Sequence, residues 1–153
     1  MKYSFEDYNE HNVLKIPLTL VLVNLYLLKH FFIFILPIIS QIPWLVKFAH
    51  ENFNLSLLLS SLPAVLVMVG MSRRLPKTRS PIIRWLWRQG RWLFLLNLVL
   101  EISLIILYVA LEIKKFNEAS LIFLYTDVVL IIFLFRSARV RDIFAEFPEK
   151  TSF

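Results

Sequence analysis

Four long apolar runs dominate this chain of 153 residues. We place them at residues 16–38, 55–71, 92–111 and 119–135, and each is close to the roughly 17–25 residues that cross the hydrocarbon core of a bilayer. The runs are continuous rather than alternating, so they predict helices and not the strands of a barrel. The sequence therefore predicts an all-α, polytopic membrane protein, with one domain over residues 1–153 and four transmembrane helices in a bundle.

The first run has two possible layouts. It begins near Pro17 and carries Lys29 and His30 at its centre. In the interpretation that we favour it is a single span, since about 20 residues is the usual crossing length. In the alternative, a short entry helix ends at Leu28, and a second apolar segment over residues 31–46 re-enters the bilayer or lies on its surface.

Basic residues are distributed unevenly between the connections. Seven arginine and lysine residues, and no acid, lie between the second and third runs, whereas the first connection carries one lysine, Lys47. Three more arginines follow the fourth run. Because positive loops stay in the cytoplasm, we expect the central connection and both termini to be cytoplasmic. The opening residues are acidic and lack a signal-peptide pattern, so we expect the first run to remain in place.

Two short amphipathic segments flank the runs, at residues 81–91 and 137–147. In the first, Ser80 is a suitable helix cap and Pro81 a favoured first residue. Arginine and tryptophan prefer the headgroup layer, so we expect this segment to lie at the cytoplasmic surface and contact anionic lipids. The expected headgroup contacts are Arg84, Trp85, Arg88, Arg91 and Trp92.

The second flanking segment has an apolar stripe that ends at Pro148. Its members are Val140, Ile143, Phe144 and Phe147. We favour anchoring to the bilayer for both flanking segments, with a docking surface for a cytoplasmic partner as the alternative.

Three charged residues stand inside the apolar runs: Lys29, Glu101 and Asp127. A charge at the bilayer centre costs about 2.5–3.5 kcal/mol on insertion scales, and such residues face a bundle interior or a cavity. Counting 1.5 Å per residue places both acids at similar depth, and the lysine leans toward them. With their polar neighbours, we expect an intramembrane polar cluster of Lys29, His30, Glu101, Asp127, Asn24 and Asn97.

Two roles fit such a cluster. Two carboxylates beside one ammonium group leave one extra negative charge, so one acid holds a proton unless His30 is charged; this is the logic of a proton or cation site. A structural lock, in which buried pairs fix the helix register, is the role we favour. A third possibility is that Lys29 reaches the interface and meets neither acid.

The second run carries no charge. Ser56, Ser60 and Ala64 recur every four residues, which predicts a small-residue face for close helix packing, within the bundle rather than between copies. Pro63 predicts a bend in the same run.

No pattern predicts enzymatic chemistry. The chain has no cysteine, its three histidines lack metal-ligand spacing, and it has no glycine-rich phosphate loop or nucleophile elbow. We therefore expect no catalytic residues, no cofactor and no metal. The net charge of +6 lies beside the apolar runs, so its expected counterpart is anionic lipid and not nucleic acid.

The opening stretch carries a recognisable motif, Tyr3-Ser-Phe-Glu-Asp-Tyr-Asn-Glu-His followed by Leu14-Lys-Ile-Pro. With the four runs and the basic central connection, it resembles the domain-of-unknown-function 2919 family of small bacterial inner-membrane proteins. A glycine often follows the histidine in that family, where this chain has Asn12. The resemblance implies four helices in a bacterial inner membrane and no established activity.

Three functions remain open. We favour a non-enzymatic accessory or assembly subunit that works with a membrane-protein partner, because the chain has little mass outside the apolar runs. The alternative is a small proton-coupled transporter that works as a homo-oligomer, since four helices rarely enclose a pathway. The third is a lipid-handling protein that grips headgroups with its Arg/Trp segment.

Overall fold

The computed structural model of the protein describes residues 2–149, and within that range it contains helices, turns and one isolated bridge between Tyr8 and Leu14. The prediction of an all-α fold is confirmed for this part of the chain. In chain order the helices are η1 (Phe5–Asp7), α1 (Leu18–Leu27), α2 (Lys29–Ile39), α3 (Pro43–Asn52), α4 (Leu55–Ser60), α5 (Leu62–Ser72), α6 (Pro81–Arg88), α7 (Gly90–Ala110), α8 (Glu118–Arg136) and α9 (Ala138–Ala145).

Three helical rods are long and apolar enough to cross a membrane: α4 with α5, α7, and α8. Their bounds lie within two residues of the runs expected at 55–71, 92–111 and 119–135. α1 and α2 meet the same criterion only as a pair. Counting that bent pair as one span gives four candidates, and the chain has the character of a membrane protein.

The first apolar run is not one straight helix, although the bent pair of α1 and α2 together still meets the criterion for the single span that we favoured. α1 ends at Leu27, and α2 departs at 64° after the single residue Leu28. The break lies where the alternative layout places it, but the segment expected at 31–46 is divided, because Pro43 begins α3. No proline or glycine lies at the break, so its cause is tertiary.

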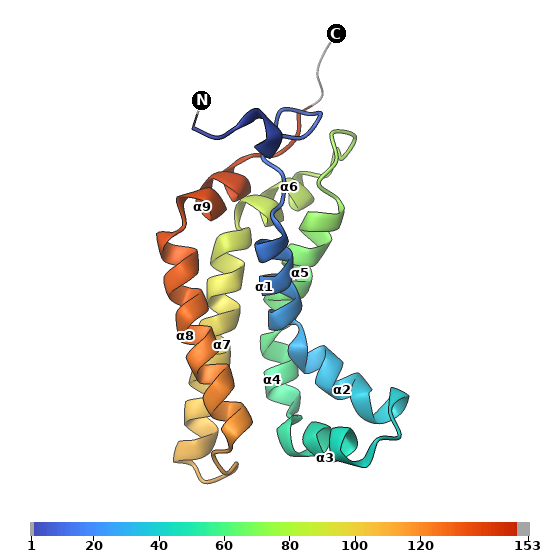
Figure 1. The fold of residues 1–153 in the computed structure, drawn as a ribbon, viewed down its shortest axis with the longest axis vertical. Helices are drawn as coiled ribbons and strands as arrows, with labels where there is room; N and C mark the ends of the chain where they lie inside the picture. Colours follow the sequence, from blue (N-terminus) through green and yellow to red (C-terminus); the bar gives the residue numbers. More distant parts are fainter. Residues whose placement is uncertain (1, 150–153) are drawn as a thin grey trace.

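α7 is the central rod of the bundle. It packs against α1, α4, α5 and α8, and these rods run side by side while α2 and α3 form an elbow that extends away from them (Figure 1). A third of the α7 window is buried, against 39% for the rod of α4 and α5 and 17% for α8, so α7 offers more surface than α8 for holding polar groups away from lipid.

The two ends of the bundle differ. One end carries the N-terminal segment from residue 2 onward, the α5–α6 connection, α6 and α9 (Figure 1). We call it the basic end, because seven arginine and lysine residues lie between α5 and Trp92. The opposite end, formed by α3 and the α7–α8 connection, is called the far end.

The apolar stripe of α9 is buried inside the protein at the basic end. Val140, Ile143, Phe144 and Phe147 are all between 0% and 8% exposed. Phe144 packs on the ring of Trp87 in α6, with centroids 4.8 Å apart, and edge-on against Phe94 of α7. The expectations of a bilayer anchor or a docking surface are therefore wrong for this stripe, because α6 folds across the bundle and the two short helices bury each other's apolar faces.

The short helices α6 and α9 together form what we call the cap of the basic end. Charged groups tie the N-terminal segment to it. Asp142 accepts hydrogen bonds from Lys2 Nζ and the Tyr3 hydroxyl, both at 2.7 Å. These bonds hold the pKa of the Asp142 carboxyl below its ordinary value. Arg74 donates to the carbonyl oxygens of Leu14 (2.7 Å) and Glu146 (3.1 Å), and burial lowers its pKa to about 10. The segment thus closes the basic end.

Candidate functional site: a buried polar cluster

The polar cluster is built around the break between α1 and α2. Lys29 and His30 are the first two residues of α2, Glu101 lies in the middle of α7, and Asp127 lies in the middle of α8. The N-terminus of a helix carries partial positive charge from its free backbone N–H groups. The start of α2 therefore offers two basic side chains and a favourable backbone field to a carboxylate.

Glu101 is the best-satisfied member of the cluster. Lys29 Nζ lies 2.7 Å from its Oε1 and 2.8 Å from its Oε2, and His30 Nε2 lies 3.1 Å from Oε1. The Glu101 side chain is fully buried, whereas that of Lys29 is 12% exposed. A buried carboxylate needs this degree of pairing, because an unpaired charge in a low-dielectric interior is strongly unfavourable.

Asp127 is only partly satisfied. The Tyr26 hydroxyl donates to its Oδ1 at 2.8 Å, and Lys29 Nζ lies 4.0 Å from the same oxygen. Its Oδ2 is buried and has no hydrogen-bond partner among the residues described. The Lys29 ammonium also lies 3.9 Å from the centroid of the Tyr26 ring, close enough for a cation–π interaction. Lys29 thus lies between the two acids, leaning toward Glu101.

The two predicted asparagines lie near the cluster but do not bond to it. Asn97, one helical turn before Glu101, is fully buried, and neither atom of its amide has a partner within residues 2–149. Asn24 is buried as well, and its Oδ1 is likewise without a partner there. The structure therefore brings together four of the six predicted members and leaves these two buried amides outside the hydrogen-bonded cluster.

The charges of the cluster do not balance by themselves. Glu101, Asp127 and Lys29 in their ionised forms sum to one negative charge when His30 is neutral. A proton on Asp127 or on His30 removes it, and each has a buried polar atom without a partner (Oδ2 and Nδ1). The cluster thus links α2 to α7 and α8 and contains two buried polar atoms without a partner among the described residues.

Sequence reasoning missed Tyr26, although its position carried a signal. It precedes Lys29 by three residues, a spacing that would place the two side chains on one face of the continuous helix expected from the sequence. It also missed Trp87, whose ring is completely buried and whose indole N–H donates to the carbonyl oxygens of Ile143 (3.1 Å) and Glu146 (2.8 Å). No sequence pattern separates this tryptophan from its exposed neighbour Trp85.

The structure exposes some of the expected headgroup contacts and turns one of them, Arg84, toward the protein. Trp85 and Trp92 are 59% and 52% exposed, and Arg88 is exposed as well. Arg91 lies over the Trp92 ring, 5.0 Å from its centroid. Arg84 instead turns to the cap, where it lies 5.2 Å from the Phe147 ring and donates to the Thr78 carbonyl. Ser80 precedes α6 without a side-chain capping bond.

The small-residue face lies on the rod formed by α4 and α5. Ser60 and Ala64 are buried and Ser56 is half-buried, on a rod that packs against α7. The Ser60 hydroxyl donates to the Leu57 carbonyl at 2.7 Å, so it is satisfied within its own helix. The rod is interrupted at Ser61, where Pro63 lies in the first turn of α5.

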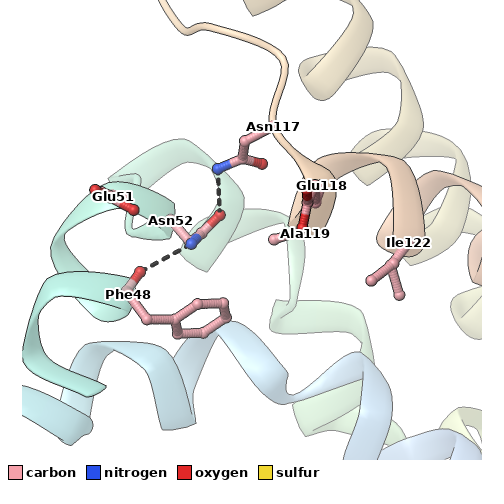
Figure 2. A pocket seen from close by; sticks show the side chains of 7 residues that line it. All are labelled: Phe48, Glu51, Asn52, Asn117, Glu118, Ala119 and Ile122. Carbon is pink, nitrogen blue, oxygen red and sulfur yellow. Dashed lines mark hydrogen bonds between the residues drawn. The ribbon is translucent and has the colours of Figure 1, made fainter. Parts of the chain in front are cut away.

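An open cavity of about 390 Å³ lies at the far end, between α3 and the start of α8. Figure 2 shows its two amides bonded together: Asn117 Nδ2 donates to Asn52 Oδ1 at 3.1 Å, and Asn52 donates to the Phe48 carbonyl. Asn117 also caps α8 by accepting from the Ser120 backbone. These groups are occupied in joining the elbow to the bundle. No grouping of three or more histidine or acidic residues suited to a metal ion occurs in the described chain.

A family model described as "Protein of unknown function (DUF2919)" matches residues 3–146. No curated protein and no solved structure matches the chain. The resemblance drawn from the opening motif is confirmed by the family match.

Proposed function

The chain belongs to the DUF2919 family of proteins of unknown function, and we propose that it acts as a non-enzymatic accessory subunit of a membrane complex. The observation that carries this proposal is that the intramembrane charges face each other. Glu101 is fully buried and paired with both Lys29 and His30, which makes the cluster a lock rather than an open site.

The lock holds the elbow in place. Lys29 and His30 begin α2, so their bonds to α7 fix the direction in which α2 leaves the bundle. Along α2, five large apolar side chains are exposed: Phe32, Phe34, Ile35, Ile38 and Ile39. An apolar hollow of about 250 Å³ lies between α2 and α3, lined among others by Phe34 and Phe53. This surface fits an apolar transmembrane helix of a partner.

Site-specific photo-crosslinking in cells tests the proposal. A photoreactive residue at Ile38, which is 74% exposed on α2, should give a discrete protein adduct. The same residue at Tyr125, which is 73% exposed on α8, should give lipid adducts alone and serves as the matched control. An adduct with a second copy would mean a homo-oligomer. Lipid adducts at both positions would contradict the accessory role.

We further propose that the basic end faces the cytoplasm of a bacterial inner membrane, with both termini inside. The support is the excess of arginine and lysine at that end. Because the chain has no cysteine, a single introduced cysteine is the only thiol of the protein that a maleimide can label. An impermeant maleimide should label Ile113→Cys at the far end in spheroplasts, and Thr78→Cys at the basic end only after lysis. The reverse pattern would invert the topology.

The second candidate is proton-coupled transport, supported by the unpartnered Oδ2 of buried Asp127 and by the helix break beside it. In proteoliposomes with an imposed potential, the protein should then move protons, detected by an internal pH dye. Asp127→Asn should stop this movement while leaving helix content unchanged. Proton movement no faster than in protein-free vesicles would exclude this function.

A further inference from the structure

An aromatic and basic surface joins α7 to α8 at the basic end. Trp92, in the first turn of α7, meets Phe135, next to last in α8, edge to face with ring centroids 6.3 Å apart. Both rings are more than half exposed, at 52% and 57%. Each ring has an arginine beside it in sequence, Arg91 and Arg136. We call these four residues the α7–α8 patch.

The patch lies where two candidate membrane spans end. α7 begins at Gly90 and α8 ends at Arg136, so the rings belong to the last turns of the apolar rods and the guanidinium groups to their margin. Exposed Trp85 and Arg88, on α6, precede the patch in the chain. This is the depth at which acyl chains give way to headgroups, and where aromatic rings and arginines are favoured.

The arginines of the patch are not neutralised by the protein. Within residues 2–149 no carboxylate lies within 4.0 Å of Arg88, Arg91 or Arg136. Two acids of the cap are already engaged, since Asp7 pairs with Arg139 at 2.7 Å and Asp142 with Lys2. The patch therefore presents positive charge beside exposed rings.

We propose that the α7–α8 patch is a binding site for an anionic phospholipid, with the headgroup phosphate between Arg91 and Arg136 and an acyl chain across Trp92 and Phe135. Guanidinium groups bind phosphate oxygens through paired N–H donors. In a zwitterionic headgroup the lipid's own cation partly neutralises the phosphate, so the attraction to the guanidinium groups is weaker. This site differs from the one expected from the sequence. It leaves out Arg84, which lies beside Phe147, as well as Trp85 and Arg88 on α6, and it gains Phe135 and Arg136 from α8.

Native mass spectrometry of the purified protein, titrated with phosphatidylglycerol or phosphatidylcholine, measures the preference directly. The wild type should bind phosphatidylglycerol more tightly. Arg91→Gln and Arg136→Gln should each weaken that binding by about fivefold and leave phosphatidylcholine unaffected, because one basic residue near a lipid surface contributes a factor of this size. Arg→Lys at either position keeps the charge but loses the paired donors, so it should retain only part of the preference.

Arg141→Gln is the matched control. It removes one positive charge from the same end, but Arg141 is 60% exposed and already lies 3.7 Å from Asp142. Its phosphatidylglycerol affinity should equal that of the wild type. If Arg141→Gln and Arg91→Gln lose the same affinity for phosphatidylglycerol, the binding is diffuse attraction to the basic end and the proposed site is contradicted. Equal affinity of the wild type for both lipids would also overturn the proposal. Displacement of the lipid by inorganic phosphate would identify an anion site that does not require acyl chains.

Discussion

Removing the Glu101 carboxylate should release the lock on the elbow. In Glu101→Leu, Lys29 loses both of its short contacts, at 2.7 and 2.8 Å, and His30 loses its contact at 3.1 Å. The nearest remaining carboxylate oxygen to Lys29 is Oδ1 of Asp127 at 4.0 Å. The variant thus leaves a largely buried ammonium group with one distant partner.

The magnitude follows from these distances. Breaking a buried pair by removing one partner costs about 3–5 kcal/mol. At 4.0 Å, Asp127 still attracts Lys29 by roughly 4 kcal/mol at an effective dielectric constant of about 20, which offsets part of the desolvation. We therefore expect Glu101→Leu to lower the free energy of unfolding by about 3 kcal/mol, the lower end of that range.

A double-mutant cycle separates the lock from simple loss of packing. Replacing both partners, in Lys29→Met with Glu101→Leu, should cost less than the sum of the two single variants, because no charge is left unpaired in that pair and only the longer contact of Lys29 with Asp127 is lost in addition. Reversible unfolding in mixed micelles, followed by tryptophan fluorescence, gives each free energy. Ser103→Ala, at an exposed position of the same helix, is the control and should be neutral. The lock is refuted if the double variant costs as much as the two single variants together.

Two further predictions concern the cap. A Cβ at Gly90 would overlap the Phe144 ring, so Gly90→Ala should destabilise by about 1–3 kcal/mol in the same unfolding assay, whereas at Gly70 the nearest atoms lie 3.7 Å away and Gly70→Ala should be tolerated. The bond from Lys2 lowers the pKa of Asp142, so the N-terminal contact is complete above the ordinary aspartate pKa and is lost as pH falls through the lowered value. Hydrogen exchange of residues 2–17 should therefore rise as pH falls through that lowered pKa. Asp142→Asn should abolish this pH dependence.

The rods were predictable because each is a long apolar run with clear end signals. The expected third and fourth runs, 92–111 and 119–135, differ from α7 and α8 by two residues at most. The similar depth of Glu101 and Asp127 along their helices was predictable too, because the rise per residue converts residue counts into depth. Which hydrogen bonds form within the cluster was not, since the partners lie on different helices.

The apolar stripe of α9 shows a different limit of sequence reasoning. Periodicity correctly selects the face that is buried, from Val140 to Phe147, but says nothing of what covers that face. Lipid, a partner and the protein's own α6 all give the same pattern. The covering residue, Trp87, is one of three tryptophans within eight residues, and only the direction of α6 across the bundle distinguishes it.

The break at Leu28 and the polar cluster are one feature. The break lies directly before Lys29, so it sets the direction in which the first two residues of α2, Lys29 and His30, approach α7. After the 64° bend both reach Oε1 of Glu101. The contacts with Glu101 stabilise a break at which no proline or glycine lies. The double variant should therefore separate stability from elbow direction. Lys29→Met with Glu101→Leu should remain folded yet give less protein adduct at Ile38, because the contacts that tie the start of α2 to α7 are then lost and only packing against α3 and α4 directs α2.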